Sequence, residues 1–216
     1  MAYAGIRMNP VDCAVYFHMR GNPNMYVIGL TGGIACGKSN AAKVLRELGA
    51  EVIDADAISH SFTMPGGAAA DAVFARFGTL DRKALGAIVF SDEEERKALN
   101  AIVHPLVQKA VDEAVAACRQ PLCVVDVPLL YEAGMESIAD EVWVVHVPRR
   151  EQLRRVIKRD TLSTKDALRR IQSQMPTEEK LRRGDAAIDT SGSREETRRQ
   201  IEVLWQGALR RAEAQP

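Results

Sequence analysis

Eight consecutive residues have the types and spacing of a phosphate-binding loop. Residues 32–39 read GGIACGKS, which fits the pattern G-x-x-x-x-G-K-S. An apolar run over residues 25–31 precedes them and a helical stretch over residues 40–48 follows, which is the context that such a loop requires. Glycines let backbone N–H groups turn toward an anion, and the start of the helix adds partial positive charge. The pattern predicts that Lys38 reaches the β- and γ-phosphates of a nucleoside triphosphate and that Ser39 ligates Mg²⁺.

The whole loop is expected to contact the nucleotide, and one of its residues is unusual. Cys36 has two interpretations: it is a small residue that fits the loop, or it is a thiol whose pKa is lowered near a helix N-terminus and whose oxidation blocks ATP. The residues predicted to bind the nucleotide are Gly33, Ile34, Ala35, Cys36, Gly37, Lys38, Ser39 and Asn40.

Three aspartates stand where apolar runs end. In open parallel sheets ligands bind beyond the carboxyl ends of the strands, so such residues are candidates for chemistry. Asp126 follows four apolar residues and is expected near Mg²⁺, unless it forms a turn. Asp54 and Asp56 lie on alternate sides of an extended chain, so at most one easily faces the γ-phosphate. Either could instead cap the helix that begins near residue 57.

Residues 149–183 form a basic segment, with twelve lysines and arginines against five acidic residues. Its simplest interpretation is a solvated basic face. The alternative is a lid that closes over the phosphates and excludes water, so that the phosphoryl group passes to an acceptor. Arg155 and Arg159 are spaced i, i+4 and therefore point from one face of a helix. His104, beside Pro105, is expected to be structural on these grounds alone.

Composition limits the class of protein. The chain has 216 residues, 46% of them hydrophobic, and 29 basic residues balance 29 acidic ones. This balance argues against a general nucleic-acid or membrane-surface binder, and no apolar run approaches the roughly 18 residues that span a bilayer. The spacing of the four cysteines predicts neither a disulfide framework nor a zinc site, which fits a reducing cytoplasm. Residues 1–24 show no clear period, so we expect a dispensable, disordered extension before a single domain over residues 25–216.

Alternating apolar runs and helical stretches predict the fold. Strands are expected over residues 25–31, 50–54, 122–126, 141–147 and 186–189, and the segments between them have helical periodicity. This order is typical of an α/β protein with a parallel sheet. Capping boxes at Ser91–Glu94 and Ser193–Glu196 predict two helix starts. Pro105 is expected to kink the helix that follows the first box, or to begin a new one.

The motifs together resemble the dephospho-CoA kinase family over about residues 25–201. The combination of Asp-Ala-Asp, His-Pro and Pro-Leu-Leu-x-Glu is far more specific than the phosphate loop alone. The matching residues are Gly29–Ile34 with Gly37–Ser39, Val52–Asp56, Leu85–Phe90, His104 and Pro105, Asp126–Glu132, Arg155, Arg159, Gln174, Lys180 and Asp185–Ile188.

The resemblance implies transfer of the γ-phosphate of ATP to the ribose 3′-hydroxyl of dephospho-CoA, the last step in coenzyme A biosynthesis, with Mg²⁺ as cofactor. It also implies a P-loop fold with five parallel strands, a helical acceptor region over residues 58–117 and a lid over residues 149–183. We expect a cytoplasmic monomer or weak homo-oligomer with no nucleic-acid or membrane partner. The implied roles are catalysis by Lys38, Asp56 and Arg155, nucleotide binding by Arg159, metal binding by Ser39 and Asp126, and acceptor binding by Asp54, His104, Pro128, Leu129, Leu130 and Glu132.

The sequence departs from the family pattern at a few positions. Ala35 replaces a glycine and is expected to lose the freedom to take a positive φ, and Asn40 replaces a β-branched hydroxyl residue. Gly184 and Thr190 stand where the family prefers Ala and Asn, which bears on the adenine contacts. Two alternatives therefore stay open: a kinase for another nucleoside or small alcohol, and a nucleotide-binding switch that does not transfer phosphate.

Overall fold

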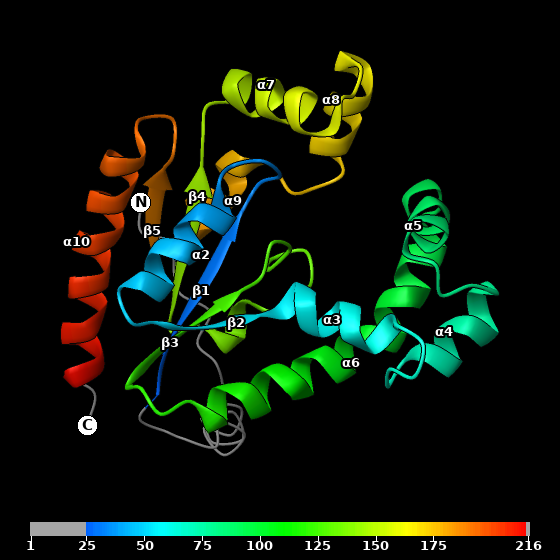
Figure 1. Cartoon of the computed structure of the whole chain (residues 1–216), viewed down its shortest axis with the longest axis horizontal. Helices are drawn as coiled ribbons and strands as arrows, with labels where there is room; N and C mark the ends of the chain where they lie inside the picture. Colours follow the sequence, from blue (N-terminus) through cyan, green and yellow to red (C-terminus); the bar gives the residue numbers. More distant parts are fainter. Residues whose placement is uncertain (1–24, 215–216) are drawn as a thin grey trace, which may run out of the picture.

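A computed structural model describes residues 25–214, and its centre is a sheet of five parallel strands in the order β2-β3-β1-β4-β5 (Figure 1). The expected extension over residues 1–24 lies outside the described residues. The α/β class and the five parallel strands predicted from the sequence are confirmed. The strands are β1 (Tyr26–Gly32), β2 (Glu51–Asp54), β3 (Leu122–Asp126), β4 (Glu141–His146) and β5 (Ala186–Asp189).

The central strands β1 and β3 are buried along their whole length because helices cover both faces of the sheet. Every residue of β1 and β3 is buried, as continuous apolar runs in parallel sheets require. The register pairs Leu30 of β1 with Asp126 of β3, and Asp126 with Asp54 of β2. The carboxyl ends of β2 and β3 therefore place two aspartates side by side, at the edge where the phosphate loop leaves β1.

Two helices cover one face of the sheet. Helix α2 (Lys38–Glu47) follows the phosphate loop, and α10 (Arg194–Glu213) packs beside it (Figure 1). Ser193 caps α10 with the reciprocal bonds of a capping box, as the sequence predicted. Leu45, Ile201 and Trp205 from these helices bury their side chains in one apolar core with strand residues such as Trp143.

The other face carries a helical unit that extends away from the sheet (Figure 1). It consists of α3 (Ala55–Thr63), α4 (Ala70–Phe77), α5 (Arg82–Ser91) and the long α6 (Glu93–Ala117), and it spans the region expected to bind the acceptor. Helix α6 runs through Pro105 without a break, so no new helix starts there. The prediction of a capping box at Ser91 is wrong. Ser91 ends α5, and Asp92 caps α6 because its side chain accepts hydrogen bonds from the backbone amides of Glu94 and Glu95.

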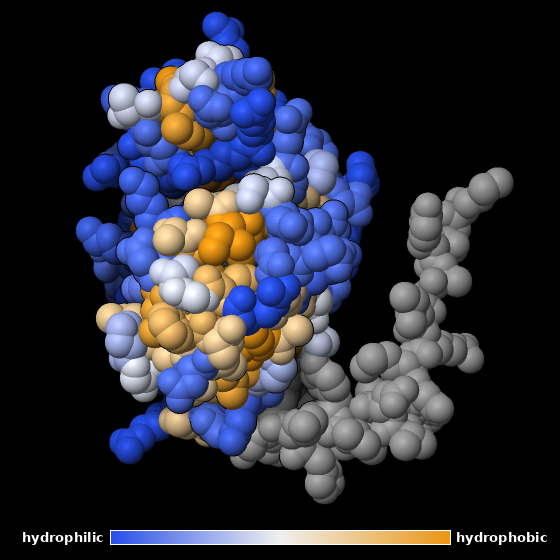
Figure 2. All heavy atoms as spheres, turned by 90° about the vertical axis from the view of Figure 1, so that its right-hand side faces the viewer, coloured by the Kyte–Doolittle hydropathy of each residue, from blue (hydrophilic) through white to orange (hydrophobic). Residues whose placement is uncertain are grey.

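Of three short helices between β4 and β5, the first two form a layer above the carboxyl edge of the sheet, and the third lies beside β4 (Figure 1). Helices α7 (Arg149–Asp160), α8 (Thr164–Gln172) and α9 (Thr177–Arg183) follow one another between β4 and β5, where the sequence predicted a lid. Val156, Ala167 and Ile171 make a small core of their own between α7 and α8. Figure 2 shows a hydrophilic mass at the top of the molecule and apolar side chains gathered below it, on the face that carries α4 and α5.

A short 3-10 turn, η1 (Glu136–Ile138), completes the elements, between β3 and β4. Within residues 25–214 we find no helix that combines the length and the apolar character needed to cross a lipid bilayer.

Candidate active site

The phosphate loop joins β1 to α2 through a tight turn. The amide of Cys36 donates to the carbonyl of Gly33 at 3.1 Å, and Gly37 takes φ 89° immediately before α2. Ala35 takes φ 58°, which corrects the expectation that this residue cannot adopt a positive φ. A left-handed alanine costs roughly 1–2 kcal/mol relative to glycine, so the surroundings of the loop must hold it there.

The cysteine of the loop is a packed residue. Cys36 is buried, and burial raises the pKa of its thiol above the ordinary value. The interpretation of Cys36 as a thiol with a lowered pKa is therefore wrong, because loss of hydration outweighs the hydrogen bonds from the backbone. Its carbonyl accepts a hydrogen bond from the Thr190 hydroxyl at 2.6 Å, which ties the loop to the end of β5.

Lys38 begins α2 and forms an ion pair with Asp126 at the end of β3. Asp126 is buried, and burial raises the pKa of its carboxyl group while the Lys38 ammonium group opposes that rise. The lysine is therefore held by an acidic partner at the carboxyl edge of the sheet, next to the loop amides.

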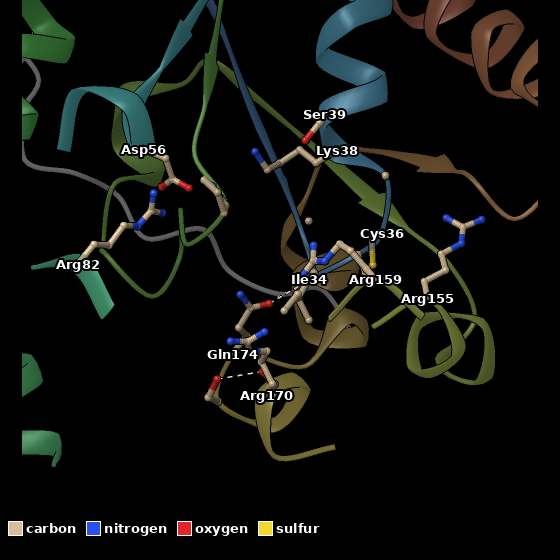
Figure 3. Close-up of a pocket in the computed structure, with 16 residues that line it drawn as sticks. Ile34, Cys36, Lys38, Ser39, Asp56, Arg82, Arg155, Arg159, Arg170 and Gln174 are labelled. Carbon is tan, nitrogen blue, oxygen red and sulfur yellow. Dashed lines mark hydrogen bonds between the residues drawn. The ribbon is translucent and has the colours of Figure 1, made fainter. Parts of the chain in front are cut away.

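An open pocket of about 880 Å³ lies between the loop, the lid and the helical unit. Figure 3 shows Lys38 pointing from the loop into the space in front of Asp56, with the lid arginines on another side. Most of the predicted site residues meet here. The pocket is lined by Gly32, Gly33, Ile34, Ala35, Cys36, Gly37, Lys38, Ser39, Asp56, Arg82, Pro128, Arg155, Arg159, Arg170, Ser173 and Gln174.

The two candidate bases differ in how their carboxylates are used. Helix α3 begins at Ala55, so Asp56 lies in a helical turn, which corrects the expected extended geometry. Asp54 caps this helix by accepting from the amide of Ala57 at 2.9 Å. Asp56 instead lines the pocket, where desolvation by the surrounding protein raises the pKa of its carboxyl group and Lys38 opposes that rise.

Arg155 and Arg159 both line the pocket from α7, as their spacing predicted. Arg155 donates to the carbonyl and the hydroxyl of Thr190 at 2.7 and 3.0 Å, so its guanidinium group is fixed over the start of the β5–α10 loop. Arg159 pairs with its neighbour Asp160 at 2.7 Å and is half exposed. Arg155 is thus the more constrained of the two cations.

The turn after β3 meets the lid through a buried lysine. The side chain of Lys180 is fully buried, and its ammonium group donates to the carbonyl of Pro128 at 2.9 Å and to Glu132 at 3.0 Å. Glu132 also accepts from the amide of Met175 at 2.9 Å. Leu130 is fully buried in the core, whereas Leu129 is exposed. Of the Pro128–Glu132 turn, Pro128 alone is among the pocket-lining residues.

Besides residues of that turn, four predicted site residues lie outside the pocket lining: Asp54, Asp126, His104 and Asn40. His104 sits half-buried on α6, and burial lowers the pKa of its imidazole. Asn40 lies in the first turn of α2, where its backbone N–H donates to the carbonyl of Gly37 at 2.9 Å.

Sequence reasoning missed several residues that shape the site. Arg82 at the start of α5 points toward Asp56, and Arg170 and Ser173 line the pocket from α8 and the turn after it (Figure 3). From the lid side, the side chain of Gln152 donates a hydrogen bond to the backbone of the loop, and the side chain of Gln174 accepts one from it. Gln174 and Lys180 belonged to the family match, but no local pattern gave either of them a role, because their partners lie far away along the chain.

The strand order, the phosphate loop and the overlying lid define a P-loop kinase fold. Kinases of this fold use ATP, generally with a divalent metal ion. A sequence profile of the dephospho-CoA kinase family matches residues 26–196. The chain therefore belongs to the dephospho-CoA kinase family, as its motifs predicted, and is a phosphotransferase by that membership.

Relatives and solved structures agree with this assignment. A Geobacter sulfurreducens protein named dephospho-CoA kinase is 46% identical over 192 residues, covering 84% of this chain and 98% of the relative. The crystal structure of TT1252 from Thermus thermophilus has a TM-score of 0.74 at 36% identity, covering 85% of this chain and 97% of that one. A dephospho-CoA kinase from Campylobacter jejuni has a TM-score of 0.59 at 28% identity, covering 86% and 98%.

Proposed function

We propose that this chain transfers the γ-phosphoryl group of ATP to the ribose 3′-hydroxyl of dephospho-CoA, giving coenzyme A and ADP. One observation supports this most directly: a single pocket has a phosphate loop on one side and a carboxylate without a capping role, Asp56, on another. Membership of the dephospho-CoA kinase family supplies the identity of the acceptor.

The loop and the lid supply the groups that hold ATP. Backbone amides over residues 33–39 cradle the β- and γ-phosphates, and the start of α2 adds partial positive charge. Lys38 neutralises charge that develops on the transferred group, at an estimated contribution of roughly 3–4 kcal/mol for one well-placed donor. Arg155, held by Thr190, and Arg159 complete the binding of the phosphates from the lid.

The residues at the carboxyl edge suit a magnesium ion. Mg²⁺ is usually held by one or two protein oxygens together with substrate phosphates and waters. Among residues 25–214 no group of three or more His, Cys, Asp or Glu side chains is arranged to hold a metal, which fits this sparse ligation. Ser39 lines the pocket beside Lys38, and Asp126 lies at the end of β3, so these two residues would hold the ion. When bound, Mg²⁺ neutralises charge on the β- and γ-phosphate oxygens.

Asp56 activates the acceptor. Its carboxylate accepts the proton of the ribose 3′-hydroxyl as that oxygen bonds to the γ-phosphorus, while the bond to the β–γ bridging oxygen breaks and ADP leaves. The environment raises the pKa of Asp56 toward the working range of a general base. Asp54 has a carboxylate oxygen engaged as a helix cap, so we assign it a supporting role beside the acceptor.

The remaining parts serve the acceptor and exclude water. The helical unit over residues 58–117 receives dephospho-CoA, and the Pro128–Glu132 turn forms the boundary between this unit and the lid. The lid over residues 149–183 covers the phosphates, which favours transfer to the acceptor over transfer to water. The balanced charge of the chain supports a small-molecule substrate and not a nucleic acid or a membrane surface. The protein is further proposed to be a cytoplasmic monomer or weak homo-oligomer in which residues 1–24 are dispensable.

A coupled assay for ADP tests the proposal. Purified protein with Mg·ATP should release ADP upon addition of dephospho-CoA, and adenosine or other nucleosides should stimulate release far less. The Lys38→Ala variant is the control for contaminating kinases. Saturable binding of Mg·ATP without turnover on dephospho-CoA would instead indicate a nucleotide-dependent switch.

A further inference from the structure

The backbone of one loop residue, Ile34, is bonded on both sides by the lid segment. The amide of Ile34 donates to Oε1 of Gln174 at 2.8 Å, and Nε2 of Gln152 donates to the carbonyl of Ile34 at 3.1 Å. Gln152 lies in the first turn of α7, and Gln174 lies in the turn between α8 and α9. Two side-chain amides from opposite ends of the lid segment therefore converge on a single residue of the phosphate loop.

The sequence of the loop makes room for this contact. A side chain at Gly33 would place its Cβ atom 2.6 Å from Nε2 of Gln152, so the amide group of Gln152 would have to shift away from its present position. Gln152 itself is buried, so its amide group has no access to bulk water in place of Ile34. A buried amide that lacks a partner destabilises the folded state, so the bond to the loop is a built-in part of the fold.

Side-chain packing joins the same two parts. Ile34 and Ala35 pack against the small core that Val156, Ala167 and Ile171 form between α7 and α8. The lid segment is thus seated on the phosphate loop through apolar contacts as well as hydrogen bonds. The left-handed Ala35 directly follows the bonded residue, so these contacts hold the loop in a conformation that an alanine does not favour.

Gln174 is also exposed to the nucleotide site. It lines the pocket together with Lys38 and Arg170, and Figure 3 shows its amide directed at the loop beside Ile34. The Ile34 amide is engaged by Gln174, and Ile34 directly precedes the loop residues whose N–H groups would cradle the phosphates in the proposed function. A shift of the loop backbone when ATP binds would reach the turn between α8 and α9 through the hydrogen bond from the Ile34 amide to Gln174.

We propose that Gln174 is a positioning residue, which together with Gln152 fixes the Ile34 peptide, shapes the loop before ATP binds and couples the occupied loop to the lid. This inference rests on the proposed function in taking Mg·ATP as the ligand of the loop. It assigns Gln174 no contact with the acceptor, so affinity for dephospho-CoA is independent of it.

Replacement of Gln174 tests the coupling, with an exposed glutamine two positions earlier as the matched control. In calorimetry Gln174→Ala should bind Mg·ATP about tenfold more weakly than the wild type, since a lost hydrogen bond of this kind is worth about 1–1.5 kcal/mol. It should also hydrolyse more ATP per coenzyme A formed, because a loosened lid admits water. Gln172→Ala should match the wild type in both measurements, and KM for dephospho-CoA should change less than twofold in either variant.

The outcomes separate the two proposals. Wild-type protein that binds no Mg·ATP overturns the proposed function, whatever Gln174 does. Wild-type protein that binds Mg·ATP while Gln174→Ala binds it equally well, with unchanged hydrolysis, overturns the role of Gln174 alone. Hydrogen exchange on unmodified protein gives a test that needs no variant: the Ile34 amide should exchange slowly before nucleotide is added, and rapid exchange there overturns the inference.

Discussion

Two of the three sides of the pocket, the phosphate loop and the helical unit, are walls that are built in different ways. The nucleotide wall consists of consecutive residues, 32–39, whose backbone is fixed by β1 and α2. Thr190 and Gln152 donate hydrogen bonds to this backbone, and Gln174 accepts one from it. The acceptor wall consists of single side chains on separate helices, among them Asp56 on α3 and Arg82 on α5. One wall is largely main chain and the other is largely side chain.

This difference separates binding from selectivity. A main-chain cradle recognises any polyphosphate tail, because amides and a helix start respond to charge and not to the identity of the nucleoside. A wall of side chains can be changed one residue at a time, so it can select the acceptor. We therefore expect damage to the first wall to affect ATP and damage to the second wall to affect the acceptor.

The largest expected effect comes from the nucleotide wall. Lys38→Ala removes the cation that faces the transferred group, and kcat/KM should fall by about 10³-fold. The matched control is Lys43→Ala on the same helix, because Lys43 is exposed and makes only a long i, i+4 pair with Glu47. Steady-state kinetics at saturating dephospho-CoA measures the effect. A loss smaller than tenfold would show that the loop amides bind and activate ATP without the lysine.

The next effect comes from the acceptor wall. Asp56→Asn should lower kcat by roughly 10²-fold while the Kd for Mg·ATP stays near normal, because the residue acts on the acceptor. Single-turnover kinetics together with calorimetry separates these two quantities. Weaker ATP binding at unchanged kcat would mean that Asp56 belongs to the nucleotide wall.

The dependence of turnover on pH gives a further test of the role of Asp56. Desolvation by the surrounding protein raises the pKa of Asp56 above its ordinary value of 3.8, although the residue is open to the pocket, and a general base must be ionised to accept a proton. Turnover should therefore fall as the pH drops through this raised pKa, at a higher pH than an ordinary aspartate would give. In Asp56→Asn this acid limb should disappear from the profile of kcat against pH. An unchanged limb in the variant would assign the titration to another group.

The same division explains what could be predicted from the sequence. The loop, the strands and the Ser193 cap depend on neighbouring residues, and local patterns located them. Even local rules failed where two adjacent residues compete, because Asp92 and not Ser91 caps α6.

Long-range contacts left no such signal. The bonds of Ile34 to Gln152 and Gln174 join residues 118 and 140 positions apart, so no spacing in the sequence reports them. The positive φ of Ala35 was missed for the same reason, since packing from the lid supports it. The acceptor wall depends on the packing of four helices, so no local pattern in the sequence indicated that Arg82 lines the pocket.

A smaller effect is expected where the lid meets the turn after β3. Lys180→Met removes a fully buried ammonium group, so Glu132 loses its cation and keeps only the hydrogen bond from the amide of Met175, while the carbonyl of Pro128 keeps the one from the Thr31 hydroxyl. The free energy of unfolding should fall by about 2–3 kcal/mol, since Glu132 keeps partial access to water. Denaturant unfolding measures this loss, and Lys165→Met, at an exposed site on α8, is the control. A variant as stable as the control would mean that the buried pair contributes nothing net.

The smallest effect should come from the second aspartate of the Asp-Ala-Asp motif. Asp54 caps α3, so Asp54→Ala should destabilise the protein by about 1 kcal/mol, while Asp54→Asn should keep the cap and most of the stability. Both variants should retain kcat within several-fold, because the remaining carboxylate at Asp56 faces the pocket. Thermal unfolding and kinetics on the same preparations compare the two effects. If Asp54→Asn loses turnover while Asp56→Asn keeps it, the base stands at the end of β2, and the helix cap is the secondary use of that carboxylate.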